Sequence, residues 1–155
     1  MNVQRILVTG ATGFVGQRVC SQLESLGAVV VKTSRAPSSE PNTFQVQALG
    51  PHTEWREALQ GCTSVVHLAA RVHVMNENAV DPLFEFRQAN TVGTLQLARQ
   101  AVQCGVKRMV FISSIKVNGE AGEFTASSIP NPIDPYGISK YEAEQQLLEF
   151  SQQSG

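Results

Sequence analysis

A tyrosine and a lysine stand four residues apart near the C-terminal end of the chain, in the stretch DPYGISKYEAE. The stretch reads as the start of a helix, and residues four apart share one helical face, so Tyr136 and Lys140 should lie side by side. A free phenol ionises at about pH 10, and forming its phenolate at neutral pH costs roughly 4 kcal/mol. A neighbouring ammonium favours the phenolate. The pair therefore predicts a general base, or a general acid in the reverse direction.

Two serines, Ser113 and Ser114, end the apolar run KRMVFISS, which we predict to be the fifth strand. In an open α/β sheet, ligands bind beyond the carboxyl ends of the strands. A hydroxyl at that place can hydrogen-bond a substrate oxygen as its charge changes. We favour Ser114 for this role, and Ser113 can equally be an ordinary serine at a strand end.

The segment VTGATGFVG carries three glycines in the spacing G-x-x-G-x-x-G, between a predicted strand and a predicted helix. In that setting the first glycine permits a tight turn, the second lets the backbone approach a pyrophosphate, and the third lets the helix lie close to the sheet. The amides at the helix start complete an anion site. A glycine-rich turn without a ligand is the alternative. We predict that the dinucleotide is contacted by Gly10, Gly13, Phe14, Val15 and Gly16.

The end of the second predicted strand, in VVVKTSRAPSS, lacks the acid that usually holds the ribose hydroxyls of NAD. It offers Lys32, Ser34 and Arg35 instead. A guanidinium can hold a 2′-phosphate through paired hydrogen bonds and can stack on adenine. We therefore predict NADP in preference to NAD, with Arg35 as the main contact and Ser34 assisting. Lys32 fits a solvated charge better, and for Arg35 a solvated loop position is the alternative.

Apolar runs alternate with helical stretches along the chain, which favours a parallel sheet covered on both faces. The pairs Asp81-Pro82 and Asp134-Pro135 each resemble a helix cap followed by proline in the first turn. The predicted architecture is a doubly wound, Rossmann-type α/β sheet with strand order 3-2-1-4-5, forming one domain over residues 1–155. We predict strands over 5–8, 28–34, 43–49, 63–70 and 107–114, and helices over 13–26, 54–59, 81–105 and from 134 onward.

Composition argues against several kinds of partner. The formal net charge of −1 gives no electrostatic reason to expect nucleic acid or an anionic membrane surface. No apolar run approaches the ~20 residues that span a bilayer, and the first residues do not form a signal peptide. The odd number of cysteines fits core thiols in a reduced compartment, so we expect a cytoplasmic protein. His52, His67 and His73 lack the spacing of metal ligands, so no metal site is predicted.

Five motifs follow one another along the chain: TGATGFVG, HLAA, NTVGT, FISS and PYGISK. In this order and spacing, the chain resembles the extended short-chain dehydrogenase/reductases. More narrowly, it is similar to the NAD(P)-binding part of the NAD-dependent epimerase/dehydratase family, over essentially all 155 residues. HLAARVHVM and SSIKVNGE are most similar to the UDP-sugar 4-epimerases and 4-keto-reductases of bacterial surface-polysaccharide synthesis.

This resemblance implies roles for the matching residues. It makes Tyr136 the catalytic acid/base and Lys140 the residue that tunes it and binds the nicotinamide ribose. Ser114 matches the serine that polarises the substrate oxygen. Asn90 matches an asparagine that braces the neighbouring strand, which is a structural role.

Other matches concern the cofactor. Leu68, Ala69 and Ala70 match the strand end that lies along it. An acid that binds the adenine amine in many family members has no counterpart here, because VQALG offers only backbone groups at Ala48 and Leu49. We therefore expect Leu49 to contact the cofactor through its backbone.

The residue two positions after Ser114 departs from the family pattern. Related epimerases often have threonine there, whereas this chain has Lys116. This lysine could contact a substrate phosphate or the sugar, or it could be a solvated loop residue. The acid pair of the dehydratases is missing, which argues against 4,6-dehydration. The resemblance thus implies hydride transfer at C4 of a nucleotide sugar such as a UDP-sugar, by 4-keto reduction, which NADP would favour, or by 4-epimerisation.

Chain length bears on this interpretation. Family members normally continue for about as many residues again and add a substrate-binding lobe, so we expect a fragment of a longer enzyme, truncated before that lobe. The fifth strand would then lie at an apolar sheet edge, which invites association. Family members often dimerise through the helices corresponding to residues 81–105 and 135–150, so a homodimer is one expectation. The alternatives are a non-catalytic NAD(P)-binding module and a redox-sensing interaction protein, although a sensor has no need of a serine, tyrosine and lysine together.

Overall fold

The computed structural model describes residues 3–46, 48–72 and 80–154. The last three residues of the HLAARVHVM motif, 73–75, lie outside the described residues. The elements in chain order are β1 (Arg5–Thr9), α1 (Phe14–Ser25), β2 (Val29–Ser34), β3 (Thr43–Gln45), α2 (Arg56–Leu59), β4 (Ser64–His67), α3 (Pro82–Phe86), the π-helix η1 (Arg87–Val92), α4 (Gly93–Gln103), β5 (Arg108–Phe111), the 3₁₀ helix η2 (Ile115–Val117) and α5 (Pro135–Ser154).

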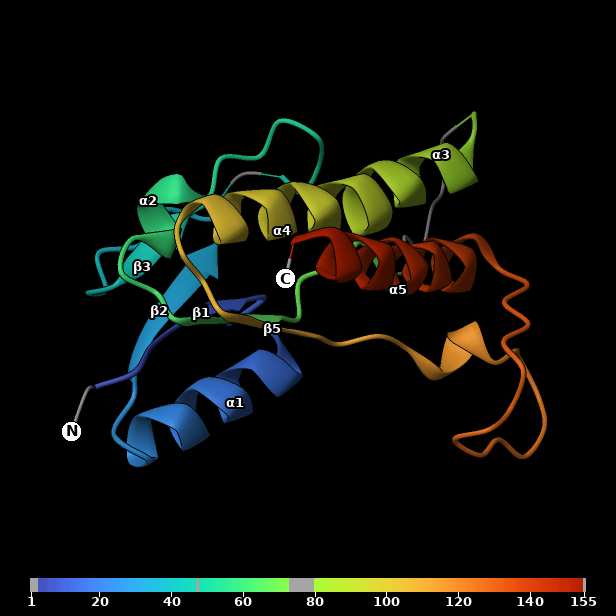
Figure 1. Cartoon of the computed structure of the whole chain (residues 1–155), viewed down its shortest axis with the longest axis horizontal. Coiled ribbons are helices and arrows are strands. Elements are labelled where there is room, and N and C mark those ends of the chain that lie inside the picture. The colour runs from blue at the N-terminus through green and yellow to red at the C-terminus, as the bar shows by residue number, and fades with distance from the viewer. Residues whose placement is uncertain (1–2, 47, 73–79, 155) are drawn as a thin grey trace.

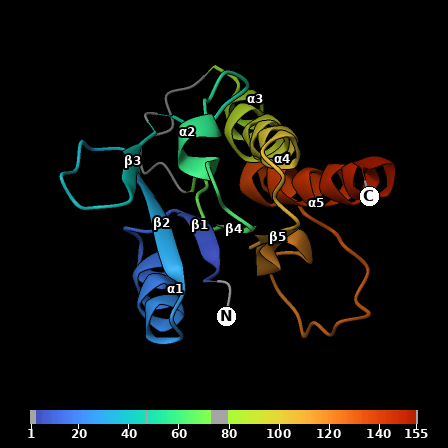
Figure 2. The same ribbon diagram turned by 60° about the vertical axis from the view of Figure 1, so that its left-hand side comes forward.

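The five strands form one parallel sheet in the order β3-β2-β1-β4-β5, which confirms the predicted α/β fold class and strand order. Helix α1 lies on one face of this sheet, and α2, α4 and α5 lie on the other (Figure 1). The view turned by 60° shows the same two layers from the side (Figure 2). Because every strand runs the same way, all five carboxyl ends meet at one edge of the sheet.

The alternation of side chains along β1 divides the core between the two faces. Leu7 is buried in the cluster that includes residues of α2 and α4, whereas Ile6 and Val8 are buried in the cluster that includes residues of α1. Successive side chains of a strand point to opposite faces, so a run of apolar residues is what a doubly covered strand requires. Burial of β1 on both sides fixes the position of the turn that follows it.

Three of the five strands are shorter than predicted at their carboxyl ends. The third strand ends at Gln45 instead of residue 49, the fourth at His67 instead of residue 70, and the fifth at Phe111 instead of residue 114. Residues 68–70 and 112–114 lie outside the strands. A run of apolar residues does not reveal where such a strand ends, because Leu68, Ala69, Ala70 and Ile112 are apolar as well.

The helix predicted over residues 81–105 is confirmed as an unbroken helical stretch over residues 82–103, although the π-helical turns in its middle were not predicted. It divides into α3, the π-helix η1 and α4. Both predicted caps are confirmed, because the side chain of Asp81 accepts a hydrogen bond from the Phe84 amide and that of Asp134 accepts one from the Gly137 amide.

Candidate functional site

The glycine-rich turn joins β1 to α1 at the carboxyl edge of the sheet. Gly10 has a φ of +69°, a conformation that favours glycine, and its carbonyl accepts a hydrogen bond from the Gly13 amide at 3.0 Å. A Cβ atom on Gly16 would lie 2.1 Å from the Gly10 carbonyl oxygen. The turn therefore requires glycine at both places, and it brings the start of α1 directly over the end of β1. Gly13 caps α1 with no side-chain hydrogen bond, so the first amides of the helix have no side-chain cap.

A groove of about 910 Å³ follows the carboxyl edge of the sheet. The structure brings all thirteen predicted cofactor residues to its lining, although they come from five separate segments of the chain. Their contact with a cofactor stays a prediction. These residues are Gly10, Gly13, Phe14, Val15, Gly16, Ser34, Arg35, Leu49, Leu68, Ala69, Ala70, Tyr136 and Lys140.

Several groove residues were not predicted from the sequence. Trp55, the single tryptophan of the chain, lines the groove just before α2 and is only 1% exposed. Arg71 and Gln88 line it on the side of η1. No local motif marks Trp55 or Gln88, whereas Arg71 stands in the HLAARVHVM motif directly after Ala70.

The end of β2 separates the two basic residues that the sequence singled out. Arg35 is exposed and lines the groove, and its carbonyl accepts a hydrogen bond from the Gln45 side chain at 3.0 Å. The ammonium of Lys32 instead forms an ion pair with Glu24 of α1 at 3.0 Å. This ion pair raises the pKa of Lys32 and holds the side chain on the α1 side of the sheet. Lys32 is thus not among the described residues that line the groove.

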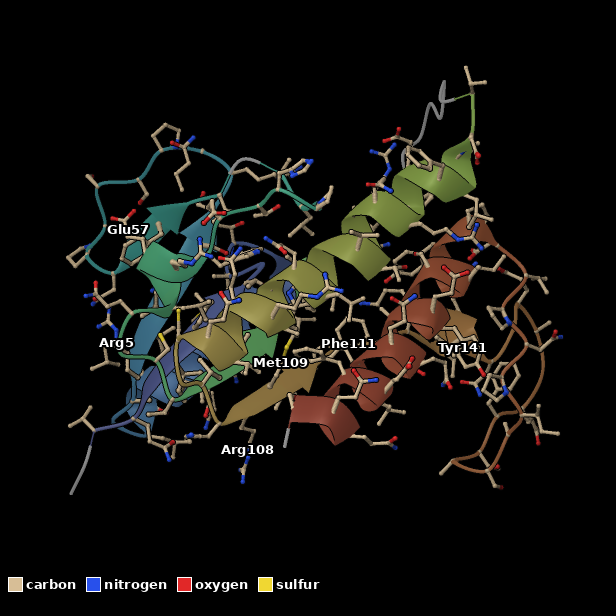
Figure 3. All side chains as sticks on the ribbon, turned by 45° about the horizontal axis from the view of Figure 1, so that its top comes forward. Arg5, Glu57, Arg108, Met109, Phe111 and Tyr141 are labelled. Atoms are coloured by element: carbon tan, nitrogen blue, oxygen red, sulfur yellow. The ribbon has the colours of Figure 1, made fainter. Side chains whose placement is uncertain are left out.

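Tyr136 and Lys140 both line the groove from the first two turns of α5. Tyr136 is half-buried, and its ring meets the ring of Phe86 edge to face, with the centroids 6.2 Å apart. Lys140 is only 2% exposed. Its Nζ donates a hydrogen bond to the Ile112 carbonyl at 2.7 Å and lies 3.9 Å from the centroid of the Phe111 ring, which Figure 3 marks on β5. Burial lowers the pKa of Lys140 to about 8.

The two serines after β5 lie in different environments. Ser113 lines the groove, and its Oγ is buried with no hydrogen-bond partner in the part of the chain that the structure describes. Ser114 caps η2 by accepting a hydrogen bond from the Lys116 amide at 3.3 Å, and it is not among the described residues lining the groove. The sequence favoured Ser114, but the structure brings Ser113 to the groove wall.

Lys116 forms ion pairs with two carboxylates. Its Nζ lies 2.6 Å from a carboxylate oxygen of Glu120 and 3.1 Å from one of Asp134, so it is more than a solvated loop charge. Its contact with a substrate stays a prediction. Both carboxylates raise the pKa of Lys116. The ion pair links the turn that follows Ser114 to the cap of the helix that carries Tyr136. A Cβ atom on Gly137 would lie 2.6 Å from the Lys116 carbonyl oxygen, so the two segments are also in close backbone contact.

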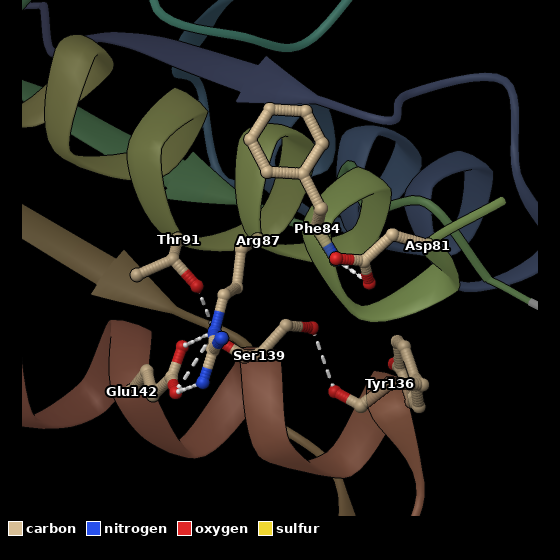
Figure 4. Close-up of polar contacts among 7 residues, drawn as sticks. All are labelled: Asp81, Phe84, Arg87, Thr91, Tyr136, Ser139 and Glu142. Atoms are coloured by element: carbon tan, nitrogen blue, oxygen red, sulfur yellow. Dashed lines mark hydrogen bonds and ion pairs between the residues drawn. The ribbon is translucent and has the colours of Figure 1, made fainter. Parts of the chain in front are cut away.

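The π-helix η1 braces the groove from the side of α5. The Asn90 side chain accepts a hydrogen bond from the Arg71 amide at 2.8 Å and donates to the Arg71 carbonyl and the Ser139 hydroxyl, each at 3.0 Å. Thr91 donates to the Ser139 carbonyl at 2.9 Å, and Arg87 forms a two-pronged ion pair with Glu142 (Figure 4). The bracing role expected for Asn90 is confirmed. The wider turn of a π-helix presents Asn90 to the segment after β4 while Thr91 faces α5, which agrees with the frequent location of such turns at functional sites.

Comparison with known proteins identifies the chain. The model of the NAD dependent epimerase/dehydratase family matches residues 6–155. The chain belongs to this family. The UDP-glucose 4-epimerase of Vibrio cholerae is 41% identical over 96% of this chain and 48% of that protein. The resemblance found in the motifs is confirmed, and the chain spans about half the length of the curated relatives it matches.

Solved structures agree with the assignment to the epimerase/dehydratase family. A short-chain dehydrogenase/reductase superfamily protein from Agrobacterium tumefaciens, with bound NAD, is 32% identical with a TM-score of 0.80, over 98% of this chain and 46% of that chain. The UDP-glucose 4-epimerase from Thermotoga maritima, with UDP-glucose, is 28% identical with a TM-score of 0.77, over 98% of this chain and 52% of that chain. The NAD dependence of the family and the Rossmann-type fold therefore rest on sequence and on structure alike.

Two further properties concern metals and membranes. Within the described residues, which leave out His73, no three His, Cys, Asp or Glu side chains are grouped so that they could hold a metal ion. No helix in the same ranges combines the length and apolar character needed to cross a membrane.

Proposed function

We propose that this chain binds a nicotinamide dinucleotide along the groove and that the protein to which it belongs acts at C4 of a nucleotide sugar. The observation that carries the proposal is that one groove contains both the glycine turn and the pair Tyr136 and Lys140. The fit is supported by Gly16, where any side chain would collide with the turn. Because residue 16 has no side chain, the first amides of α1 can approach a pyrophosphate.

The residues of this chain would handle the proton. When bound, the dinucleotide would supply or accept the hydride at the sugar carbon. In the reducing direction Tyr136 would give its proton to the C4 oxygen, and in the oxidising direction it would take that proton from the C4 hydroxyl. The buried Lys140 ammonium favours the phenolate that is left. A serine hydroxyl at the end of β5 would hydrogen-bond the same oxygen, with Ser114 implied by the family pattern and Ser113 supported by its place in the groove.

The cofactor is proposed to be NADP in preference to NAD. Arg35 supports this, since it is exposed at the end of β2, lines the groove and is not among the described residues that form an ion pair. A guanidinium at this place suits a 2′-phosphate. A preference for NADP would favour net reduction of a 4-keto sugar, whereas 4-epimerisation returns the cofactor to its starting state in every cycle.

The sugar is proposed to be carried by UDP, as in the two relatives described above whose names contain UDP-glucose. We also propose a cytoplasmic protein that forms a homodimer through the helices of residues 82–103 and α5. The 155 residues form the cofactor-binding part, and the residues that enclose the nucleotide sugar belong to the remaining half of the length seen in relatives.

Turnover of UDP-sugars tests the proposed reaction. The chain is incubated with NADPH and a UDP-4-keto sugar, or with UDP-glucose for epimerisation, and the loss of reduced nicotinamide or the formation of the epimer is followed. Tyr136→Phe should lower the rate by about a hundredfold or more, because it removes the acid/base group. The matched control is Tyr141→Phe, the same change on the same helix (Figure 3), at a residue that is not among those described as lining the groove.

A non-catalytic cofactor-binding module is the second candidate, and the length of the chain is the observation that favours it. In that case NADPH would bind while no UDP-sugar is turned over by the 155 residues. Where the unchanged chain turns over a UDP-sugar, equal rates for Tyr136→Phe and Tyr141→Phe would contradict the proposed role of Tyr136. Binding and turnover measured together thus separate the two candidates.

A further inference from the structure

Three buried side chains form a continuous hydrogen-bonded row beneath the groove. Thr9 ends β1, His67 ends β4 and Thr94 lies in α4, and each of the three is at most 1% exposed. The Thr9 hydroxyl lies 2.6 Å from His67 Nδ1, and His67 Nε2 lies 2.9 Å from the Thr94 hydroxyl. His67 is not among the described residues that line the groove, and the proposed proton transfer does not involve it.

The direction of these hydrogen bonds follows from the contacts of Thr9. Its Oγ1 accepts a hydrogen bond from the Leu68 amide at 3.2 Å and another from the Ala69 amide at 3.1 Å. A hydroxyl oxygen has two acceptor sites and one proton, so the proton of Thr9 is left to point at His67 Nδ1. His67 Nδ1 is therefore an acceptor, and the ring carries its proton on Nε2, which donates to Thr94.

The ring is neutral for two reasons. A protonated imidazole has a proton on both nitrogens, and a proton on Nδ1 would face the proton of Thr9. Burial and the positive charge of Lys140 lower the pKa of His67 to about 3. The ring of Phe111 contacts both groups: it is stacked on His67 with centroids 5.9 Å apart, and its centroid lies 3.9 Å from Lys140 Nζ.

The amides held by Thr9 belong to the wall of the groove. Leu68 and Ala69 line it directly against the glycine turn, since a Cβ atom on Gly10 would lie 2.8 Å from the Ala69 nitrogen. We infer that His67 is a positioning residue for the cofactor. Its neutral Nε2-protonated form holds the Thr9 hydroxyl in the orientation that fixes the Leu68–Ala69 backbone against the turn. The inference rests on the proposed binding of a dinucleotide in the groove.

Nitrogen NMR of the chain labelled at histidine tests the state of His67 without any substitution. The expected spectrum has an unprotonated Nδ1 and a protonated Nε2 for His67, unchanged from pH 8 to pH 5. The two other histidines, His52 and His73, provide the comparison in the same sample. Protonation of His67 near the ordinary value of about 6.5, or a proton on Nδ1, would overturn the inference.

Cofactor binding tests the consequence for the groove. His67→Asn places an acceptor near the position of Nδ1, whereas His67→Leu removes it. We expect NADH to bind about tenfold more weakly to His67→Leu, and within about threefold of the unchanged chain for His67→Asn. Equal affinity of His67→Leu and the unchanged chain, or equal weakening in both variants, would contradict the positioning role.

A second pair of variants covers the case in which His67→Leu does not fold. Thr9→Ser keeps the hydroxyl, and Thr9→Val removes it with little change in volume. NADH affinity should be retained in Thr9→Ser and fall about tenfold in Thr9→Val, and equal affinities would count against the inference. Failure of the unchanged chain to bind either NADH or NADPH would refute the proposed function and with it the positioning role. The NMR spectrum would still decide whether His67 has the inferred tautomer.

Discussion

Replacing Lys140 by methionine should make the folded chain more stable at neutral pH. The ammonium is 2% exposed, and burial lowers the pKa of Lys140 from 10.5 to about 8. The side chain is therefore still charged at neutral pH, and the folded state bears the cost of keeping that charge out of water. Methionine has a similar length and no charge, so it fits the same site without this cost.

The size of the effect follows from the pKa difference between the folded and unfolded chain. At about 1.36 kcal/mol for each pH unit, the difference corresponds to roughly 3 kcal/mol at neutral pH. Between pH 8 and pH 10.5, Lys140 is protonated in the unfolded chain but has lost its proton in the folded chain. The free energy of unfolding of the unchanged chain, relative to that of Lys140→Met, therefore rises with pH in this window. Below pH 8 both states are protonated, and the full cost remains.

Urea unfolding at a series of pH values provides the assay. The difference in the free energy of unfolding between Lys140→Met and the unchanged chain should be largest at pH 7 and shrink by about 3 kcal/mol by pH 10.5. Lys107→Met is the matched control, because Lys107 is exposed. The variant should also lose turnover, since Lys140 is proposed to tune Tyr136. A difference that does not change between pH 8 and pH 10.5 would refute the argument that burial of Lys140 opposes its charge.

Two other substitutions test separate parts of the account. Arg35→Gln should weaken NADPH binding about tenfold or more and leave NADH binding within twofold, as measured by calorimetry, whereas Lys32→Gln should change neither. Tighter binding of NADH than of NADPH by the unchanged chain would contradict the role of Arg35. Gly137→Ala should lower the free energy of unfolding by about 1–3 kcal/mol, because its Cβ would lie 2.6 Å from the Lys116 carbonyl oxygen. An unchanged unfolding temperature in calorimetry would show that α5 does not pack closely on η2.

Local features of the sequence predicted the frame of the site well. The glycine turn, the cap at Asp134 and the position of Tyr136 and Lys140 along the same groove each depend on residues within one or two turns of the chain. Such features are visible in sequence because turn and cap geometry restrict the residue types that fit. The strand order followed from the same elements, because parallel strands joined by right-handed connections allow few topologies.

The features that the sequence did not predict depend on long-range packing. The π-helix η1 is set by the contacts of Asn90 and Thr91 with segments far away in the chain, and the helical pattern of apolar residues continues through it. Ser113 and Ser114 are neighbours with the same side chain, so only the backbone after β5 decides which one faces the groove. The partner of Lys116 at the helix cap stands eighteen residues later, which no local pattern reveals.

Energy transfer from Trp55 to NADH tests the central claim, that the groove at the carboxyl edge of the sheet holds a nicotinamide dinucleotide. Trp55 is the single tryptophan and lines that groove, so its emission reports on a ligand bound there. The account predicts that titration with NADH quenches Trp55 with a saturable one-to-one curve, that emission of the reduced nicotinamide appears in parallel, and that NAD reverses both. A folded chain whose Trp55 emission shows no saturable response to NADH or to NADPH, or a response that the oxidised cofactor does not compete away, would contradict it.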